Sequence, residues 1–302
     1  MISPSTRSIA DARFEELGLT LSFGQHVEVS DRFGSAPLAD RVADLHDAFA
    51  DPDVDAVLTV IGGFNANQLL PHLDWELIGS NPKVFCGYSD ITALTCAINT
   101  MTGLVTYSGP HYSTFGMRDH FANSLRWFTE ALFTDDAVVA TPADSWTDDE
   151  WYVDQDQREV RPNDGHWILR SGAAAGSIVG GNLCTLNLLH GTPWMPDLND
   201  SVVFVEDDRD SSIATFDRDL TSLTQQAGFE SVRALFIGRF EPHLGMDSET
   251  LTAIVESNRA LDGIPVIANV DFGHTDPLLT IPVGGHATVD AGESETSITL
   301  QA

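Results

Sequence analysis

The sequence predicts an α/β protein built from two folded units. In residues 1–133, apolar runs that end in glycine or serine alternate with helical patterns, which is the order of a parallel sheet with crossover helices. In residues 167–302, short apolar strands and glycine-rich segments surround two helical patterns, which indicates a second, mixed unit. Residues 134–166 are acidic and hold few apolar runs, so we expect an irregular connector with room for a short hairpin.

The elements of the first unit follow one another in alternation. Residues 4–18 begin with Ser5 or Thr6 as a cap and end at Gly18, which is typical of a helix. The run at residues 55–63 is continuously apolar and ends in two glycines, as in a strand buried on both faces. Helical patterns cover residues 4–18, 37–50, 66–82 and 91–103. Strand patterns cover residues 19–29, 55–63, 83–90 and 104–109.

The second unit is predicted from shorter runs. Its apolar segments are four to eight residues long and bounded by glycine, proline or aspartate, which favours strands over helices. Strand patterns lie within residues 173–186, 201–207, 233–240, 265–273 and 278–290. Helical patterns lie within residues 216–228 and 249–261. The result is a β-rich α/β unit.

The charge of the chain excludes several classes of partner. There are 45 Asp and Glu residues against 15 Lys and Arg residues, a formal net charge of −30. Nucleic acids and anionic membranes need a basic surface, so we expect neither as a partner. Lys83 is the single lysine among these cations, and 31 of the acids are Asp. Because salt screens self-repulsion, we predict a protein adapted to molar salt; a mildly acidic protein from ordinary salt is the alternative.

Cysteines and hydropathy predict where the protein works. Three cysteines form neither a closed disulfide framework nor a zinc pattern, and Cys86 and Cys96 lie in apolar stretches typical of a core. The first residues lack the apolar centre of a signal peptide, and no apolar run reaches the length of a membrane span. The histidines show no metal-ligand spacing and no phosphate-binding loop is present. We therefore expect a cytoplasmic protein without metal or cofactor.

Ser89 is the candidate nucleophile. A buried strand runs directly into the segment Gly87-Tyr88-Ser89-Asp90, and a helical pattern starts at once after it. A serine at such a turn is displayed above the sheet edge, and the following backbone N–H groups favour an anion. The alternative is that Ser89 or Asp90 merely caps the helix.

Three further segments could complete a hydrolytic site. Gly62 and Gly63 end a buried strand, which frees backbone N–H groups for an oxyanion, although a plain turn would look the same. Glu206 ends another apolar strand and could orient a histidine, or be a solvated strand end. His274 follows an apolar strand and has the chemistry of a general base, although single histidines are more often structural.

Four regions of the chain resemble the LD-carboxypeptidases (muramoyltetrapeptide carboxypeptidases). They are residues 61–78, 85–94, 180–208 and 271–285, with Gly-Tyr-Ser-Asp and Phe-Gly-His-Thr-Asp-Pro among their motifs. The resemblance implies a Rossmann-like N-terminal domain at 1–133, the connector at 134–166 and a β-rich swivelling domain at 167–302. It also implies a homodimer. Family members begin with a further strand, most of which is missing before Ser3, so we expect a late start or a shortened sheet edge.

The resemblance also assigns roles. It implies a Ser-Glu-His triad at Ser89, Glu206 and His274, with the backbone N–H groups of Asp90 and Gly63 as the oxyanion hole. Water would then hydrolyse an acyl-enzyme on Ser89.

The family has two branches, and the amino-acid sequence of the loop at residues 62–71 is more similar to the microcin C self-immunity branch. That branch hydrolyses the bond between an aminoacyl group and a nucleotide, whereas the other removes D-Ala from murein tetrapeptide. Candidate substrate-binding residues are Gly62, Asn65, Asn67, Trp146, Trp151 and Trp167. Tryptophan could stack on a base, or simply pack in the core. The alternatives are murein peptide cleavage and a non-catalytic binding protein; an α/β-hydrolase esterase is disfavoured because Ile91 replaces the expected glycine.

Overall fold

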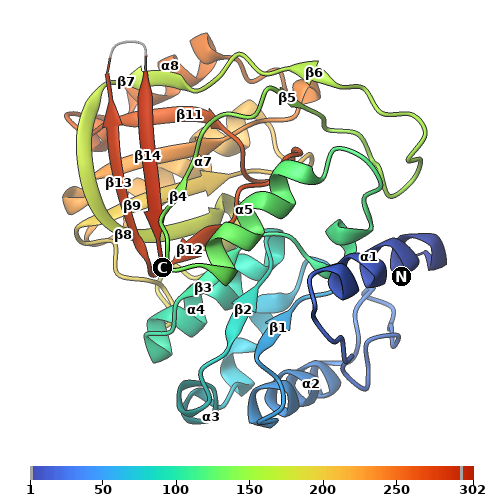
Figure 1. The fold of residues 1–302 in the computed structure, drawn as a ribbon. Coiled ribbons are helices and arrows are strands. Elements are labelled where there is room, and N and C mark those ends of the chain that lie inside the picture. The colour runs from blue at the N-terminus through green and yellow to red at the C-terminus, as the bar shows by residue number, and fades with distance from the viewer. Residues whose placement is uncertain (1–2, 293–294) are drawn as a thin grey trace.

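A computed structural model describes residues 3–292 and 295–302, and in it two sheets lie one above the other (Figure 1). The smaller sheet has four strands in the order β1-β2-β3-β12, and the larger has eight in the order β4-β14-β13-β8-β9-β10-β11-β7. This arrangement confirms the α/β class, with parallel strands in the N-terminal region and a β-rich C-terminal region. Among the described residues, no helix combines the length and apolarity that crossing a bilayer requires.

The N-terminal sheet forms where the buried runs were predicted. Its strands are β1 (Ala56–Leu58), β2 (Val84–Cys86) and β3 (Thr106–Ser108), all parallel, with β12 (Ile281–Val283) antiparallel to β3. The helices around it are α1 (Pro4–Glu16), α2 (Leu38–Ala50), α3 (Trp75–Ser80), α4 (Thr92–Thr102) and α5 (Ala122–Phe133). The cap of α1 is Ser3, whose Oγ accepts the Thr6 N–H, rather than Ser5 or Thr6. Residues 1–2, where any remnant of a first strand would fall, lie outside the described residues.

The strand predicted for residues 19–29 is wrong. The main chain turns back on itself there, since the N–H of Val27 bonds to the carbonyl of Gly24 and that of Val29 to the carbonyl of His26. His26 is also tied to Asp44 of α2, with 2.8 Å between its Nδ1 and the carboxylate. The alternating pattern therefore has no partner strand, and Phe23 and Val29 remain exposed.

Residues 134–166 hold three strands of two residues each. β4 (Val138–Val139) pairs with the edge of the large sheet, and β5 (Ser145–Trp146) pairs antiparallel with β6 (Arg161–Pro162). Thr147 bridges to Asp276, which lies just beyond His274 in the chain. The connector is thereby joined to the segment that carries the candidate base.

The large sheet has a parallel centre. Its strands are β7 (Trp167–Arg170), β8 (Gly172–Asn182), β9 (Ser201–Glu206), β10 (Ala234–Gly238), β11 (Val266–Val270), β13 (His286–Ala291) and β14 (Thr296–Gln301). Its helices are α6 (Leu183–Asn187), α7 (Ile213–Thr224) and α8 (Ser248–Ser257). Strands β8 to β11 run parallel to one another. Strands β7 and β14 and helix α5 were not predicted. The strand predicted for residues 173–186 is wrong at its end, where α6 forms because the Asn182 side chain caps a helix by accepting the Thr185 N–H.

Helix α4 connects the two sheets. Its first residue, Thr92, accepts a 2.9 Å hydrogen bond from the N–H of Asn182 at the end of β8, and Cys96 Sγ lies 3.6 Å from the carbonyl of Gly180. A side chain at Gly180 would overlap the carbonyl of Phe204, and one at Gly181 would overlap Thr92. The two glycines are therefore required by close packing, which brings the start of α4 against the carboxyl end of β8.

Candidate active site

Ser89 lies at a strained turn between β2 and α4. Its φ of 63° falls in the left-handed region, which is uncommon for a residue with a side chain. The preceding Gly87 leaves no room for a side chain, because a Cβ there would overlap Thr59. Strain of this kind persists where the surrounding structure enforces it, and it is frequent at functional sites. The turn displays Ser89 at the start of a helix, as the sequence predicts.

The three predicted triad residues lie within hydrogen-bond reach. The Nε2 atom of His274 is 2.9 Å from Oγ of Ser89, and its Nδ1 atom is 2.7 Å from Oε2 of Glu206. These contacts join residues that are 185 and 68 positions apart in the chain. The geometry is that of a nucleophile bonded to a base whose other nitrogen is oriented by a carboxylate.

Glycines hold the Glu206–His274 pair in close contact. Glu206 ends β9 and is 2% exposed. A Cβ at Gly273, where φ is 104°, would lie 2.6 Å from Oε2 of Glu206, and a Cβ at Gly238 would lie 2.7 Å from the Cβ of Glu206. The glycine before His274 is therefore needed for the carboxylate to reach the imidazole.

The electrostatics of the site favour a protonated His274. Burial alone would lower its pKa, but the carboxylate of Glu206, with the charges of Asp208 and Glu241, raises it to about 9. Burial also raises the pKa of Asp207 to about 7. At neutral pH His274 thus carries a proton, which it must lose before it can accept one from Ser89.

The two predicted oxyanion segments meet at Ser89. A Cβ added to Gly62 would lie 3.1 Å from the Cβ of Ser89 and 3.3 Å from its Oγ, so the absence of a side chain there lets the loop approach. The carboxylate of Asp90 accepts a 2.8 Å hydrogen bond from the N–H of Ala66, which ties the serine turn to the Gly62-Gly63 loop. Within residues 3–292 and 295–302, the N–H of Gly63 donates to no protein acceptor. Its role as an oxyanion donor stays a prediction.

Asn65 and Asn67, two of the predicted substrate-binding residues, lie in the loop that follows Gly63. Asn65 braces its own loop, because its amide donates to Ser35 and accepts from Arg41. Asn67 is part of the short helical turn Ala66–Gln68 that follows.

The tryptophans are engaged by the protein itself. The Trp146 ring lies next to the guanidinium groups of Arg161 and Arg239. Trp151 packs edge-on against Tyr152. Trp167 lies in β7 and bonds to Asp164. Their role in substrate binding stays a prediction.

One group of side chains could hold a cation. Ligand atoms of Cys184, Asp207 and Asp208 lie within 4.8 Å of one another, immediately beyond Asn182 and Glu206. Burial and the neighbouring carboxylates raise the pKa of the Cys184 thiol to about 12, and its Sγ lies 3.1 Å from Oδ1 of Asn182. Thiolate, not thiol, is the metal ligand, so this group is poorly prepared for a metal.

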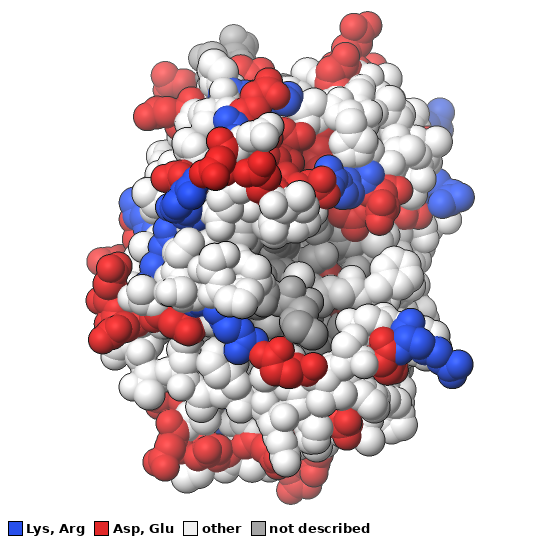
Figure 2. Space-filling view, turned by 90° about the vertical axis from the view of Figure 1, so that its right-hand side faces the viewer, with Lys and Arg blue, Asp and Glu red and all other residues white. Residues whose placement is uncertain are grey.

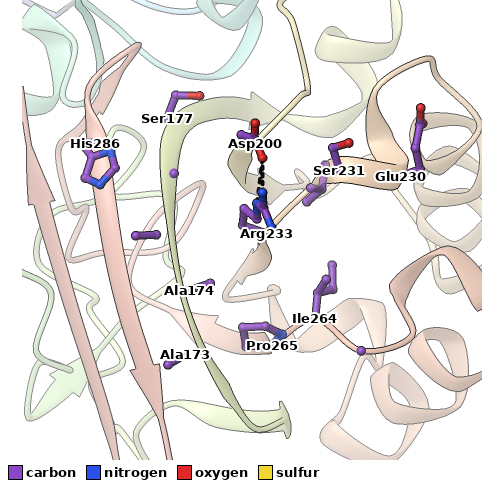
Figure 3. A pocket seen from close by; sticks show the side chains of 14 residues that line it. Ala173, Ala174, Ser177, Asp200, Glu230, Ser231, Arg233, Ile264, Pro265 and His286 are labelled. Carbon is purple, nitrogen blue, oxygen red and sulfur yellow. Dashed lines mark hydrogen bonds and ion pairs between the residues drawn. The ribbon is translucent and has the colours of Figure 1, made fainter.

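The surface reflects the net charge of the chain. Figure 2 shows acidic side chains spread over one face of the molecule. A hollow lies near the middle of this face. A separate broad pocket of about 810 Å³ lies at the amino ends of β8 to β11, where Arg233 pairs with Asp200 (Figure 3). Glu206 and His274 lie at the opposite, carboxyl ends of these strands, where α/β sheets bind ligands. The pocket is therefore distinct from the candidate active site.

Sequence reasoning missed two buried polar residues beside the triad. Asn182 is paired in register with Glu206 on the neighbouring strand, and its Nδ2 has no partner among the described residues. His111 lies beneath the serine turn and contacts Tyr88. Asn182 ends β8 and His111 follows β3, so both lie at the carboxyl end of a strand, which is the signal that could have identified them.

Family models decide the relationship of this chain to known proteins. The LD-carboxypeptidase N-terminal domain matches residues 1–109, and the LD-carboxypeptidase C-terminal domain matches residues 175–289. The chain belongs to the LD-carboxypeptidase family. This confirms the resemblance drawn from its sequence motifs.

Relatives fall in both branches of the LD-carboxypeptidase family. The chain is 45% identical to the MccF-like protein of Bacillus anthracis str. Ames, with a TM-score of 0.98 over 100% of this chain and 93% of that one. It is 32% identical to the microcin C7 self-immunity protein MccF of Escherichia coli, over 94% of this chain and 85% of the relative. It is 26% identical to the murein tetrapeptide carboxypeptidase of Pseudomonas aeruginosa, over 96% and 92% respectively. A solved structure of MccF in complex with glutamyl sulfamoyl guanosine superposes with a TM-score of 0.87 at 28% identity, covering 99% of this chain and 91% of that one.

Proposed function

We propose that this protein is a serine hydrolase that cleaves the bond between an aminoacyl group and a nucleotide or its analogue. The observation that carries the proposal is the continuous hydrogen-bond chain from Ser89 through His274 to Glu206. A binding protein would not need a strained serine held at 2.9 Å from an oriented imidazole. Catalysis is therefore favoured over ligand binding alone.

The reaction follows from the positions of these atoms. Neutral His274 takes the proton of Ser89 as Oγ attacks the carbonyl carbon, and the imidazolium is stabilised by Glu206. The N–H groups of Asp90 and Gly63 stabilise the oxyanion. Collapse of the intermediate breaks the bond to the leaving group, which receives the proton from His274. Water, deprotonated by the same histidine, then hydrolyses the ester on Ser89.

The proposed substrate class rests on similarity and on charge. The MccF relatives bind aminoacyl sulfamoyl nucleotides in their solved complexes. Around His274 of this chain the charges of Glu206, Asp208 and Glu241 are negative. Such surroundings favour the ammonium group of an aminoacyl substrate over a free peptide carboxylate beside the triad.

Murein tetrapeptide cleavage is the second candidate. This reaction needs a cation that binds the terminal carboxylate of the peptide, and the planar guanidinium group of an arginine suits that role. Arg209 follows Glu206 closely but is paired with Glu150 and lies 3.6 Å from Glu241. Arg158 is buried, and its Nη2 lies 3.7 Å from Asp276. Because both arginines face acidic partners, this candidate ranks below the first.

A side-by-side assay tests the proposal. Aminoacyl-sulfamoyl-adenosine and an L,D-tetrapeptide are incubated with the protein in molar KCl, and released products are quantified. The expected result is hydrolysis of the first substrate, lost in Ser89→Ala and retained in the control Ser177→Ala at the opposite end of the sheet. Preferred cleavage of the tetrapeptide would assign the protein to the murein branch, and activity that survives Ser89→Ala would overturn the mechanism. Cytoplasmic location, the homodimer and salt adaptation stay predictions.

A further inference from the structure

His111 lies between the two loops that form the proposed active site, and the reaction steps above do not use it. It follows β3, whose carboxyl end faces the same edge as those of β1 and β2. The chain just after it is bonded to the segment that leads into the Gly62-Gly63 loop. The N–H of Tyr112 donates to the carbonyl of Thr59 at 2.9 Å, and that of Ser113 to the carbonyl of Val60 at 3.0 Å.

The side chain of His111 reaches the other loop. Its Nε2 lies 3.0 Å from the carbonyl oxygen of Tyr88 and 3.3 Å from its amide nitrogen. The imidazole is stacked on the Tyr88 ring, with 4.1 Å between centroids. Tyr88 immediately precedes Ser89, so His111 holds the residue from which the strained turn departs.

His111 is held in its neutral form. It is 3% exposed, and burial lowers its pKa to about 3; the charge of His274 acts in the same direction. A neutral ring protonated at Nε2 donates to the Tyr88 carbonyl, and the other tautomer accepts from the Tyr88 N–H. In either tautomer the ring bonds to the Tyr88 main chain. It also adds no positive charge next to His274.

The same ring contacts the glycine loop. A Cβ added to Gly62 would lie 3.4 Å from Cε1 of His111, at nearly the distance it would have from Ser89. Gly62 therefore lies against both Ser89 and the imidazole of His111. A change in the His111 side chain would alter how closely the Gly62-Gly63 loop approaches the Ser89 turn.

We infer that His111 is a positioning residue that sets the spacing of the oxyanion hole and enforces the strained conformation of Ser89. The inference rests on the proposed function for its catalytic part. Its structural part, the coupling between His111 and the strain at Ser89, stands independently. An oxyanion donor misplaced by a fraction of an ångström weakens a transition-state interaction while leaving ground-state binding nearly intact.

The catalytic test compares three variants on aminoacyl-sulfamoyl-adenosine. His111→Leu removes the hydrogen bond, His111→Gln retains an N–H donor at a similar reach, and His166→Leu is the control. His166 is a partly buried histidine whose pKa is also lowered by burial, but it bonds to Thr296 in the large sheet. We expect His111→Leu to lower kcat by about 10²-fold with KM changed less than threefold, His111→Gln to recover most of that loss, and His166→Leu to retain kcat. Equal kcat in His111→Leu and the wild type would overturn the catalytic part.

A stability cycle tests the structural part without any assay of activity. Thermal midpoints are measured for the wild type, His111→Leu, Ser89→Gly and the double variant. In the wild type, part of the stability lost through His111→Leu is regained because the freed turn can relax its strain. Glycine adopts a φ of 63° without strain and has nothing to regain, so the midpoint lost through His111→Leu should be at least half as large again in the Ser89→Gly background. An equal loss in both backgrounds would mean that His111 only fills space, and would overturn the inference. If the wild type hydrolyses neither substrate, the proposed function fails, and this cycle still decides whether His111 enforces the turn.

Discussion

Replacing Glu206 by Gln should shift the pH dependence of the enzyme as well as its rate. Since burial lowers the pKa of His274 and the acidic neighbours raise it to about 9, the free enzyme needs alkaline pH to expose a neutral base. At pH 7 His274 is therefore mostly protonated. For the wild type we therefore expect kcat/KM to rise about tenfold per pH unit from pH 7 and to level off near pH 9.

Glu206→Gln keeps the shape of the side chain and removes its charge. Burial then dominates, and the pKa of His274 should fall to its usual range near 6.5 or below. The rising part of the pH profile of kcat/KM therefore moves down by about two pH units. As a result, kcat/KM of the variant should not change between pH 7 and pH 9. Its plateau should lie on the order of 10⁴-fold below that of the wild type, because the imidazolium formed during attack loses its counter-charge.

The same variant has a stability signature. Burial lowers the pKa of His274 and the acidic neighbours raise it to about 9, so the net stabilisation of the protonated imidazole on folding is on the order of 3 kcal/mol. Because the folded pKa lies above the unfolded one, this stabilisation is fully present below pH 6.5 and is lost as pH rises through about 9. The difference in unfolding free energy between the wild type and Glu206→Gln should therefore shrink between pH 6.5 and pH 9.

The measurements are kcat/KM from pH 5 to pH 10, chemical denaturation over the same range, and an NMR titration of the His274 imidazole. Asp276→Asn is the matched control. Burial raises the pKa of Asp276 to about 7, but Asp276 is not bonded to His274, so the rise in kcat/KM near pH 9 should persist. Two results would refute the role assigned to Glu206. One is a wild-type kcat/KM that does not change from pH 6 to pH 9, and the other is a rise in kcat/KM that stays near pH 9 in Glu206→Gln.

Three further predictions follow from the geometry. Ser89→Gly should abolish hydrolysis while raising the unfolding free energy by about 1 kcal/mol, because the left-handed turn no longer carries strain; calorimetry that detects no gain would contradict this. Gly62→Ala should place a methyl group 3.3 Å from Oγ of Ser89 and lower kcat/KM at least tenfold without lowering the melting midpoint, whereas an unchanged rate would show that the loop lies farther from the nucleophile in solution. Molar KCl should raise the melting midpoint, since it shortens the screening length to about 3 Å and relieves a net charge of −30; a midpoint independent of KCl would exclude salt adaptation.

Local patterns predicted most elements but not their partners. The runs that became β1, β2 and β9 were recognisable because continuous apolar sequence reports burial on both faces. The alternation in residues 19–29 is also a strand pattern, yet its main chain is turned, and the N–H of His26 donates to the carboxylate of Asp44 in α2 instead. Alternation reports a side-chain preference, and pairing depends on whether another strand is within reach.

The pairing of strands also divides a segment that the sequence predicted as part of one unit. The segment 278–290 was expected in the second unit, but its first strand, β12, pairs with β3 of the N-terminal sheet while β13 pairs with β8. Gly284, with a φ of 87°, lies in the short turn between them. No local pattern distinguishes a strand that returns to the first sheet from one that stays in the second.

The sequence by itself determined the α/β class, the acidic charge and the positions of the residues whose side chains are suited to catalysis. Each of Ser89, Glu206 and His274 was nonetheless compatible with a plain structural role, because a hydrogen bond between distant residues leaves no local trace. The tertiary structure decided that they meet, through α4 packed on the glycines of β8 and through Gly273 against Glu206. It also decided the pKa of His274 and the role of His111, since both depend on burial and on charges gathered from separate strands.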